Sequence, residues 1–384
     1  MPQQEKHQHT SAQHTAATPL RIGFVDLIDA APLIVAHEKG FFAAEGLRVT
    51  LERQLGWGNV RDRLTFGQLD AAHALLGMPL FSRIGRDWFI EPLVALTNLG
   101  SGGNAITLSR RLIDAGVRTP ASLAQYIRND PRQEVMLFAH VFSCSTHHYL
   151  LRDWLASSGV DPDRDVRLRV FPPNQMAGHM KRGYLEGFCA GEPWNTLARQ
   201  EGSGEIVAVT ADIVPEHPEK VLAVTRRWLD RNANVATPLV RAVLRGCAFC
   251  EDERNIDALT DLLARPQYLN LPREVIAKAV SLDRSDIRGS SSDWRVRSFA
   301  PSATFPSMTQ SAWLATQMVR WGHLRAEVDI HALARACVDT MAYRAAARSL
   351  GIECPSSDHP PMRLRGGLFD PFKTSASLVG ETHT

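Results

Sequence analysis

The chain has little excess charge of either sign and no long apolar run. Its 384 residues include 43 lysines and arginines and 41 aspartates and glutamates, which leaves a formal net charge of +2. So small a surplus, with no basic stripe interleaved with aromatic residues, predicts no direct nucleic-acid binding. A membrane-spanning helix needs a run of about 18 or more apolar residues. The sequence contains none, so we expect no membrane insertion.

Features of a leader peptide are also missing. Residues 1–19 are polar, with no apolar core, no twin arginine and no cysteine for lipid attachment. This composition predicts neither a secretory signal nor a membrane anchor. We therefore expect residues 1–19 to form a disordered arm and the protein to be cytoplasmic.

Cysteine is scarce, with six residues spread along a large chain, which predicts reduced thiols. Cys247 and Cys250 form a Cys-x-x-Cys pair. They lie near the end of a predicted apolar helix face, whereas redox pairs usually lie at a helix start. A zinc site would need a second pair of similar spacing, and the sequence has none. We predict no metal site and no cofactor.

Signatures of the common catalytic sites are absent as well. There is no HExxH, no nucleophile elbow and no Gly-Lys-Ser/Thr phosphate loop. A catalytic hypothesis would make Cys189 a nucleophile, with His179 or Glu192 as its partner. The simpler interpretation is that Cys189 belongs to the core. We therefore predict a binding protein and not an enzyme.

The clearest pattern that is present runs over residues 20–62. Residues 20–26 and 49–54 alternate apolar and polar side chains, which is typical of strands. Between them lies a helical pattern for which Asp29 is a plausible N-cap. This strand–helix–strand unit predicts parallel strands, and ligands of such sheets bind at the carboxyl ends of the strands. The segment Gly56-Trp57-Gly58-Asn59 is therefore a predicted ligand wall.

Alternation of strands and helices occurs twice and is followed by mostly helical patterns. Among these, apolar residues at helical spacing predict helices at 256–263, 273–280 and 330–350. This order predicts an α/β fold with two lobes, a ligand cleft between them and a helical C-terminal region. The predicted boundaries are a disordered arm at 1–19, the first part of lobe I at 20–105, lobe II at 106–222, a mostly helical return to lobe I at 223–354 and an extended tail at 355–384.

Three residues are candidates for binding a small ligand. His147 lies in the first turn of a predicted helix, where free N–H groups and the imidazole could hold an anion; a surface histidine is the alternative. Lys220 precedes an apolar strand and could place a point charge in the cleft, although most lysines face water. Trp57 could cover a planar ligand, or it could be an ordinary core residue.

Several stretches occur together in an order found in one family. They include LGWGNVRDRL, SCSTHHYLLRDWLASSGVDPDRDV, GFCAGEPWN and HPEK. With these stretches, about residues 20–350 resemble the nitrate- and bicarbonate-binding proteins of the bacterial nitrate transporter type (NrtA-like), which have the type II periplasmic-binding-protein fold. The resemblance implies an anion pocket between the two lobes. The pocket residues that it implies are Trp57, Gly58, Asn104, His147 and Lys220.

Two of these positions bear on the ligand. Asn104 stands where the transporter type has a glutamine, and its side chain is shorter by one methylene, so the contact there could be lost, water-bridged or differently aimed. In bicarbonate-binding relatives an acidic residue replaces the lysine and works with a calcium ion. Lys220 therefore favours nitrate or nitrite and argues against a metal. We expect Lys220→Glu to abolish nitrate binding and to leave the fold intact.

The absence of an exported leader makes the chain similar to the cytoplasmic nitrate sensor of nitrate-assimilation operons (NasS-like). This resemblance implies that nitrate or nitrite closes the cleft and releases an ANTAR-type RNA-binding antitermination regulator (NasT-like). One alternative is a solute-binding receptor of an ABC-type nitrate/nitrite (or bicarbonate) transporter. A remote alternative is an enzyme similar to the pyrimidine-precursor synthases of the same fold.

Overall fold

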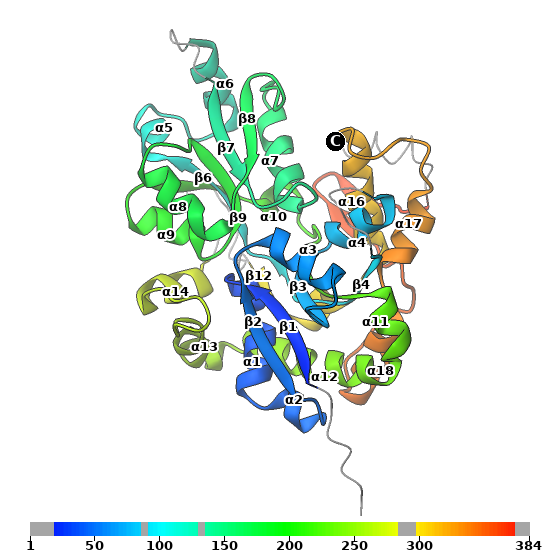
Figure 1. Cartoon of the computed structure of the whole chain (residues 1–384). Coiled ribbons are helices and arrows are strands. Elements are labelled where there is room, and N and C mark those ends of the chain that lie inside the picture. Colours follow the sequence, from blue (N-terminus) through cyan, green and yellow to red (C-terminus); the bar gives the residue numbers. More distant parts are fainter. Residues whose placement is uncertain (1–18, 86–90, 130–134, 283–296, 373–384) are drawn as a thin grey trace, which may run out of the picture.

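The computed structural model describes residues 19–85, 91–129, 135–282 and 297–372. Two five-stranded sheets form its framework, one in each of two lobes (Figure 1). Nearly all of the predicted arm at 1–19, and residues 373–384 of the predicted tail, lie outside the described residues. Within the described residues, no helix combines the length and the apolar character needed to span a bilayer.

The sheet of lobe I has the strand order β2-β1-β3-β11-β4. Strand β1 runs parallel to both β2 and β3, as the strand–helix–strand pattern predicts. Strand β11 comes from far along the chain and runs antiparallel between β3 and β4. The bounds of these strands are β1 Leu20–Val25, β2 Val49–Gln54, β3 Ala71–Leu75, β4 Leu93–Asn98 and β11 Lys220–Thr225.

Helices from both ends of the sequence cover this sheet. Helix α12 packs against α1 near the N-terminus and against α18 near the C-terminus, and together they bury one large apolar cluster. The helices of lobe I before the chain leaves it are η1 Ile28–Ala30, α1 Ala31–Glu38, α2 Phe41–Ala44, α3 Trp57–Thr65 and α4 Gly77–Ile84. Those after it returns are α11 Arg226–Arg231, α12 Ala233–Glu251, η2 Glu253–Asn255, α13 Ile256–Leu263, α14 Arg273–Val280, α15 Pro301–Thr304, α16 Met308–Arg320, α17 Ile330–Cys337 and α18 Thr340–Ser349.

The sheet of lobe II has the order β10-β6-β9-β7-β8. Strand β7 is parallel to β8 and β9, whereas β6 is antiparallel to β9 and β10. Its strands are β6 Asn104–Ser109, β7 Met136–His140, β8 Val166–Val170, β9 Gly187–Gly191 and β10 Gly204–Val209. Its helices are α5 Arg110–Asp114, α6 Pro120–Asn129, α7 Thr146–Ala156, α8 Pro173–Lys181, α9 Trp194–Gln200 and α10 Thr210–Ile213.

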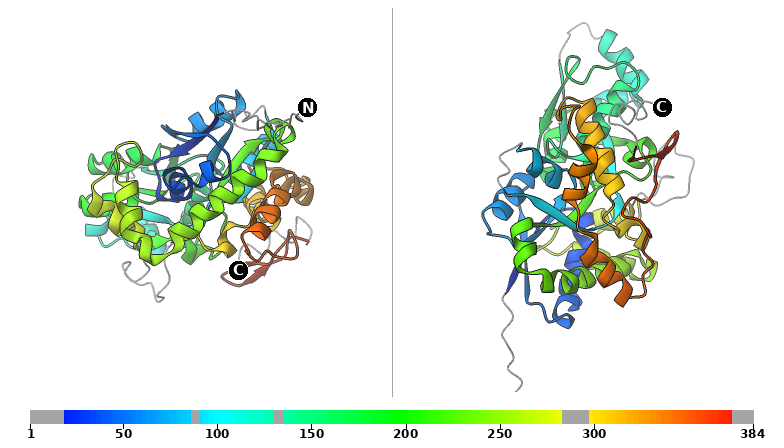
Figure 2. Two further views of the ribbon diagram at one scale, coloured as in Figure 1. Left: turned by 90° about the horizontal axis from the view of Figure 1, so that it is seen from below. Right: turned by 90° about the vertical axis from the view of Figure 1, so that its right-hand side faces the viewer.

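Two small sheets complete the fold. Strand β5 (Ser101–Gly102) pairs with β12 (Arg297–Ser298), and β13 (Met362–Leu364) forms a hairpin with β14 (Gly367–Phe369). Figure 2 shows this C-terminal hairpin in dark red beside the orange helices. Because Met362 and Phe369 are buried, residues 355–372 are not simply the extended tail that the sequence predicts.

The structure places some boundaries differently from the prediction. Residues 220–222 belong to the sheet of lobe I, although the predicted lobe II extends to residue 222. The boundary was misplaced because a lysine is not expected in a buried strand, whereas β11 is buried from its first residue, Lys220. Residues 104 and 105 belong to the sheet of lobe II, although the predicted first part of lobe I extends to residue 105. The single helix predicted over 330–350 is two helices, α17 and α18. They separate because Val338 bridges to Ala95 of β4, after which Asp339 caps α18.

Candidate functional site

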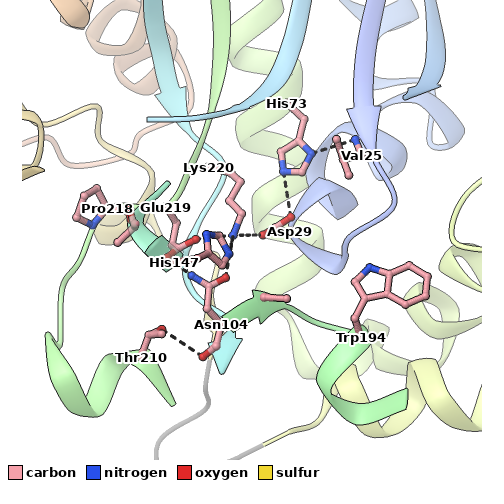
Figure 3. Close-up of polar contacts among 12 residues, drawn as sticks. Val25, Asp29, His73, Asn104, His147, Trp194, Thr210, Pro218, Glu219 and Lys220 are labelled. Carbon is pink, nitrogen blue, oxygen red and sulfur yellow. Dashed lines mark hydrogen bonds and ion pairs between the residues drawn. The ribbon is translucent and has the colours of Figure 1, made fainter. Parts of the chain in front are cut away.

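The candidate site is centred on the ammonium group of Lys220, which is buried at the start of β11. Its Nζ lies 2.7 Å from Asp29 Oδ2, 2.5 Å from Glu219 Oε2 and 2.9 Å from Asn104 Oδ1 (Figure 3). The Nε2 atom of His147 is a fourth neighbour at 3.3 Å. An ammonium group has three N–H donors. The two carboxylates and the amide oxygen can therefore accept all three of them.

Both lobes contribute to this cluster. Lobe I supplies Asp29 from η1, directly after β1, and Glu219 and Lys220 from the start of β11. Lobe II supplies Asn104 as the first residue of β6 and His147 from the first turn of α7. Ser145 caps α7 by accepting a hydrogen bond from the N–H of His148, so His147 lies at a well-defined helix start, as predicted. The Lys220 side chain thus joins the two lobes.

The buried groups of the cluster shift one another's pKa values. Burial raises the pKa of both carboxyl groups, but the neighbouring Lys220 and histidines outweigh it. The pKa of Glu219 falls to about 2, and that of Asp29 lies well below its ordinary value. Burial lowers the pKa of His147 to about 3, with a further contribution from Lys220. At neutral pH the inner cluster therefore holds one cation, two carboxylates and a neutral imidazole.

Each of the two carboxylates also contacts a histidine through its other oxygen atom. His73 of β3 accepts a hydrogen bond from the N–H of Val25 at Nδ1 (3.3 Å), and its Nε2 lies 3.0 Å from Asp29 Oδ1. The Nδ1 atom of His217 lies 2.8 Å from Glu219 Oε1. Both histidines are fully buried. Each carboxylate is therefore held between the ammonium of Lys220 and an imidazole.

Trp57 and Gly58 lie outside the inner cluster. Trp57 is the first residue of α3, and its buried ring meets the ring of His73 edge-on, with 5.1 Å between centroids. His73 in turn lies 3.0 Å from Asp29, so Trp57 packs against the outer side of the cluster. A Cβ added to Gly58 would meet no atom within 4 Å, so no close approach requires glycine there.

Two buried donors of the site lack a partner. Among the residues that the structure describes, neither Nε1 of Trp57 nor Nδ1 of His147 has a hydrogen-bond partner. Because Nε2 of His147 faces the Lys220 ammonium, the proton of this neutral ring belongs on Nδ1. Leaving a buried donor unpaired costs about 1–3 kcal/mol, so such groups call for an explanation.

Glu219 and Gly191 were not among the candidate residues predicted from the sequence, and Asp29 was predicted only as a helix N-cap. The Asp29 side chain makes no capping hydrogen bond, which corrects its predicted role as an N-cap. A Cβ added to Gly191 would lie 3.4 Å from Asn104 Oδ1 and 3.5 Å from Asp29 Oδ2. The available signal was position, since Asp29 and Gly191 follow or end strands of the two sheets and Glu219 precedes Lys220.

The residues of the catalytic hypothesis show no activation. Burial raises the pKa of the Cys189 thiol, and Glu219 raises it further, so the thiol stays protonated. Glu192 instead accepts a hydrogen bond from the N–H of Thr196 at the start of α9. The six cysteines are free thiols, and within the described parts of the chain no group of three or more histidine, cysteine or acidic residues is arranged to hold a metal.

The lobes are in direct contact around the cluster. The N–H of Ile28 donates to the carbonyl of Glu192 (2.9 Å), and the indole N–H of Trp194 donates to the carbonyl of Asp26 (3.1 Å). On the other side, the Thr146 hydroxyl donates to the carbonyl of Pro218 (2.8 Å). The predicted cleft is thus filled at its centre by side chains from both walls.

Comparison with known proteins gives a consistent result. A model of the NMT1-like family matches residues 13–264. The nitrate/nitrite binding protein NrtA of Synechococcus elongatus is 34% identical over 376 residues, which cover 94% of this chain and 85% of that protein. The bicarbonate transport ATP-binding protein CmpC of the same species is 39% identical over 342 residues. These cover 87% of this chain but 50% of CmpC, so the chain spans about half the length of that relative.

Solved structures agree with the fold. The periplasmic nitrate-binding protein NrtA from Synechocystis PCC 6803 superposes with a TM-score of 0.88 at 30% identity, over 94% of this chain and 98% of that one. The alkanesulfonate-binding protein SsuA from Xanthomonas axonopodis has a TM-score of 0.61 at 17% identity, over 84% and 98% of the two chains, and supports the fold alone. The predicted two-lobed α/β fold is confirmed.

Proposed function

Because the chain belongs to the NMT1-like family, and within it to the NrtA-like nitrate- and bicarbonate-binding proteins, we propose that it binds nitrate or nitrite as a solute receptor of an ABC-type importer. The observation that carries this proposal is the buried Lys220 ammonium, which lies 3.3 Å from Nε2 of His147, a ring whose Nδ1–H has no partner. The ring of Trp57, whose indole N–H also lacks a partner, packs against His73 outside the inner cluster.

The chemistry of the ligand matches these groups. Nitrate and nitrite are small, singly charged and able to accept hydrogen bonds only through oxygen or nitrogen lone pairs. A buried anion needs a cation and several donors, because an uncompensated buried charge costs several kcal/mol. Lys220 supplies the charge, and His147, Asn104 and Trp57 can supply neutral donors.

Separation of the lobes explains how an anion could enter. Lys220, Asp29 and Glu219 belong to lobe I, whereas Asn104 and His147 belong to lobe II. When the lobes separate, Asn104 moves away from the Lys220 ammonium, and one N–H donor of that ammonium becomes free. An anion that takes this place receives the Lys220 donor from lobe I. A turn of the His147 ring, whose Nε2 now faces the ammonium, would bring its N–H donor from lobe II to the same anion. Closure around the anion then restores the contact between the lobes.

The relatives favour an import receptor over the sensor predicted from the sequence. These relatives are named as a nitrate/nitrite binding protein and as an ATP-binding protein of bicarbonate transport. Release of an RNA-binding antitermination regulator, and a cytoplasmic location, stay predictions. They depend on the same binding step, because a ligand that favours the closed lobes must weaken any partner that binds the open ones.

Calorimetric titration of the whole chain tests the proposal. We expect saturable one-to-one binding of nitrate or nitrite without added metal. His147→Phe keeps a ring of similar size but removes the Nδ1–H donor, and it should weaken binding by about 10-fold or more. His179→Phe on α8 of lobe II is the matched control and should bind as the wild type does. Binding only of bicarbonate with calcium, or of none of these anions, would contradict the proposal.

A further inference from the structure

The two outer histidines differ in the protons that they can hold. Nδ1 of His73 accepts the backbone N–H of Val25, so this ring cannot gain a second proton without losing that hydrogen bond. For His217 the surroundings are different. Its Nδ1 faces two acceptors, Glu219 Oε1 at 2.8 Å and the carbonyl of Pro218 at 3.3 Å, and so carries a proton. Its Nε2 lies 2.8 Å from the hydroxyl of Thr210.

The Thr210 hydroxyl can serve either form of His217. A hydroxyl both donates and accepts, and it rotates to suit its neighbours. Thr210 Oγ1 also lies 3.2 Å from the backbone carbonyl of Asn104 (Figure 3). When Thr210 donates to that carbonyl, its oxygen can accept a hydrogen bond from Nε2–H of a protonated His217. When it donates to Nε2, His217 is neutral. A proton can therefore be gained with a rotation of one hydroxyl and no movement of heavy atoms.

The protonation of His217 sets the charge of the buried cluster. With His217 neutral, Lys220 faces two carboxylates and the cluster carries one net negative charge. With His217 protonated, the net charge is zero. The nearby groups on α7 and β9 do not change this count, because burial keeps both the His147 imidazole and the Cys189 thiol neutral. On the segment that carries His217, Glu216 is exposed and faces Arg363, and Asp212 is half-buried.

A monovalent anion is expensive to add to a buried cluster that is already negative. Like charges close together in a low-dielectric interior repel each other much more strongly than in water. Protonation of His217 removes the excess negative charge. Glu219 then pairs with two cations, so the ion pair between Glu219 and the Lys220 ammonium can weaken.

We propose that His217 takes up a proton when the anion binds beside Lys220, so that the site binds an anion and a proton together. The proposal rests on the proposed function and deepens it. His217 does not touch the anion in this scheme. It is a positioning residue that acts through Glu219, and no group other than a solvent proton is transferred.

Nitrate titration in two cationic buffers of different ionisation enthalpy, Tris and Bis-Tris, measures the protons exchanged. We expect a net uptake of up to one proton by the wild-type chain near pH 7. By linkage, the Kd for nitrate should rise by up to about tenfold for each unit of increase in pH, over the pH range in which one full proton is taken up per anion bound. His217→Gln can still donate to Glu219 but cannot carry a charge, so it should lose both the uptake and the pH dependence. His179→Gln should keep both.

Each of the following results would overturn the inference. Wild-type binding with no proton uptake would refute it while leaving the proposed function intact. Unchanged uptake in a folded His217→Gln variant would place the proton elsewhere. The absence of nitrate and nitrite binding by the wild type would remove the proposed function and this inference with it. If His217→Gln does not fold, Thr210→Val supplies the test. This variant leaves Nε2–H without its acceptor and should reduce the uptake, and full uptake would be the contradicting result.

Discussion

Replacement of Lys220 by methionine is the sharpest test of the buried cluster. Methionine has about the length of the lysine stem but carries no charge. The change removes three short contacts of Nζ, with Asp29, Glu219 and Asn104, and leaves two carboxylates facing each other inside the protein. Removal of one partner from a buried ion pair costs about 3–5 kcal/mol, since the other charge is left uncompensated. We expect a loss of unfolding free energy of this order, together with the loss of nitrate binding.

The structure also revises the expectation for Lys220→Glu. The sequence predicts that this variant keeps its fold. In the structure a third carboxylate would join Asp29 and Glu219 in a buried site without a cation. We therefore expect Lys220→Glu to unfold more readily than Lys220→Met, and loss of binding by it does not isolate a role in recognition.

The pH dependence of stability gives an independent readout with a definite sign. In the wild type the folded pKa of Glu219 is depressed to about 2 from 4.5. This group therefore contributes stability above about pH 4.5, which is lost as the pH falls toward about 2. Burial by itself raises the pKa of both carboxyl groups, so without Lys220 we expect their pKa values to lie above those of the unfolded chain. Stability of Lys220→Met should then increase as the pH falls through these raised values, opposite to the wild type.

Urea denaturation at several pH values measures both effects. Lys181→Met is the matched control, because Lys181 is 60% exposed and lies 3.4 Å from Glu201. Such surface pairs contribute about 0–1 kcal/mol, so the control should unfold close to the wild type. If Lys220→Met loses no more stability than Lys181→Met, or if its stability falls with decreasing pH in parallel with the wild type, the proposed charge compensation is wrong.

Three further substitutions probe the fit of the lobes and the donors. A Cβ on Gly77 would lie 1.8 Å from the carbonyl oxygen of Cys144 in the other lobe, so Gly77→Ala should hold the lobes apart and weaken nitrate binding. Small-angle scattering measures the separation and calorimetry the binding. Gly178→Ala, whose Cβ makes only ordinary contacts, is the control. Asn104→Gln adds a methylene at a fully buried position, which should cost about 1–3 kcal/mol in urea denaturation, and an equally stable variant would show spare room there. Trp57→Phe keeps an aromatic ring beside His73 but removes the unpartnered indole N–H; unchanged nitrate affinity would exclude this donor from the site.

Local patterns were sufficient for most of the fold. The predicted strand at residues 49–54 and the helices at 256–263 and 273–280 have the bounds of β2, α13 and α14. These segments have clear periodicity and end at turn residues, so local energetics and burial favour the same structure. The prediction failed at 330–350, where a bridge from Val338 to β4 divides one helical pattern into two helices. A contact with a residue so distant in sequence leaves no local signal.

The sequence by itself determined the α/β class and the presence of two lobes, because motif order and strand ends are local properties. It also pointed to His147 and Lys220 as candidate residues, whereas Asn104 was implied by the family resemblance. Only the tertiary structure decided how Lys220 is compensated. Asp29, Glu219, His73 and His217 surround it from three separate parts of the chain. Which charges share a low-dielectric interior depends on how the two lobes pack, and charge pairing there is set by distances that no spacing along the sequence encodes.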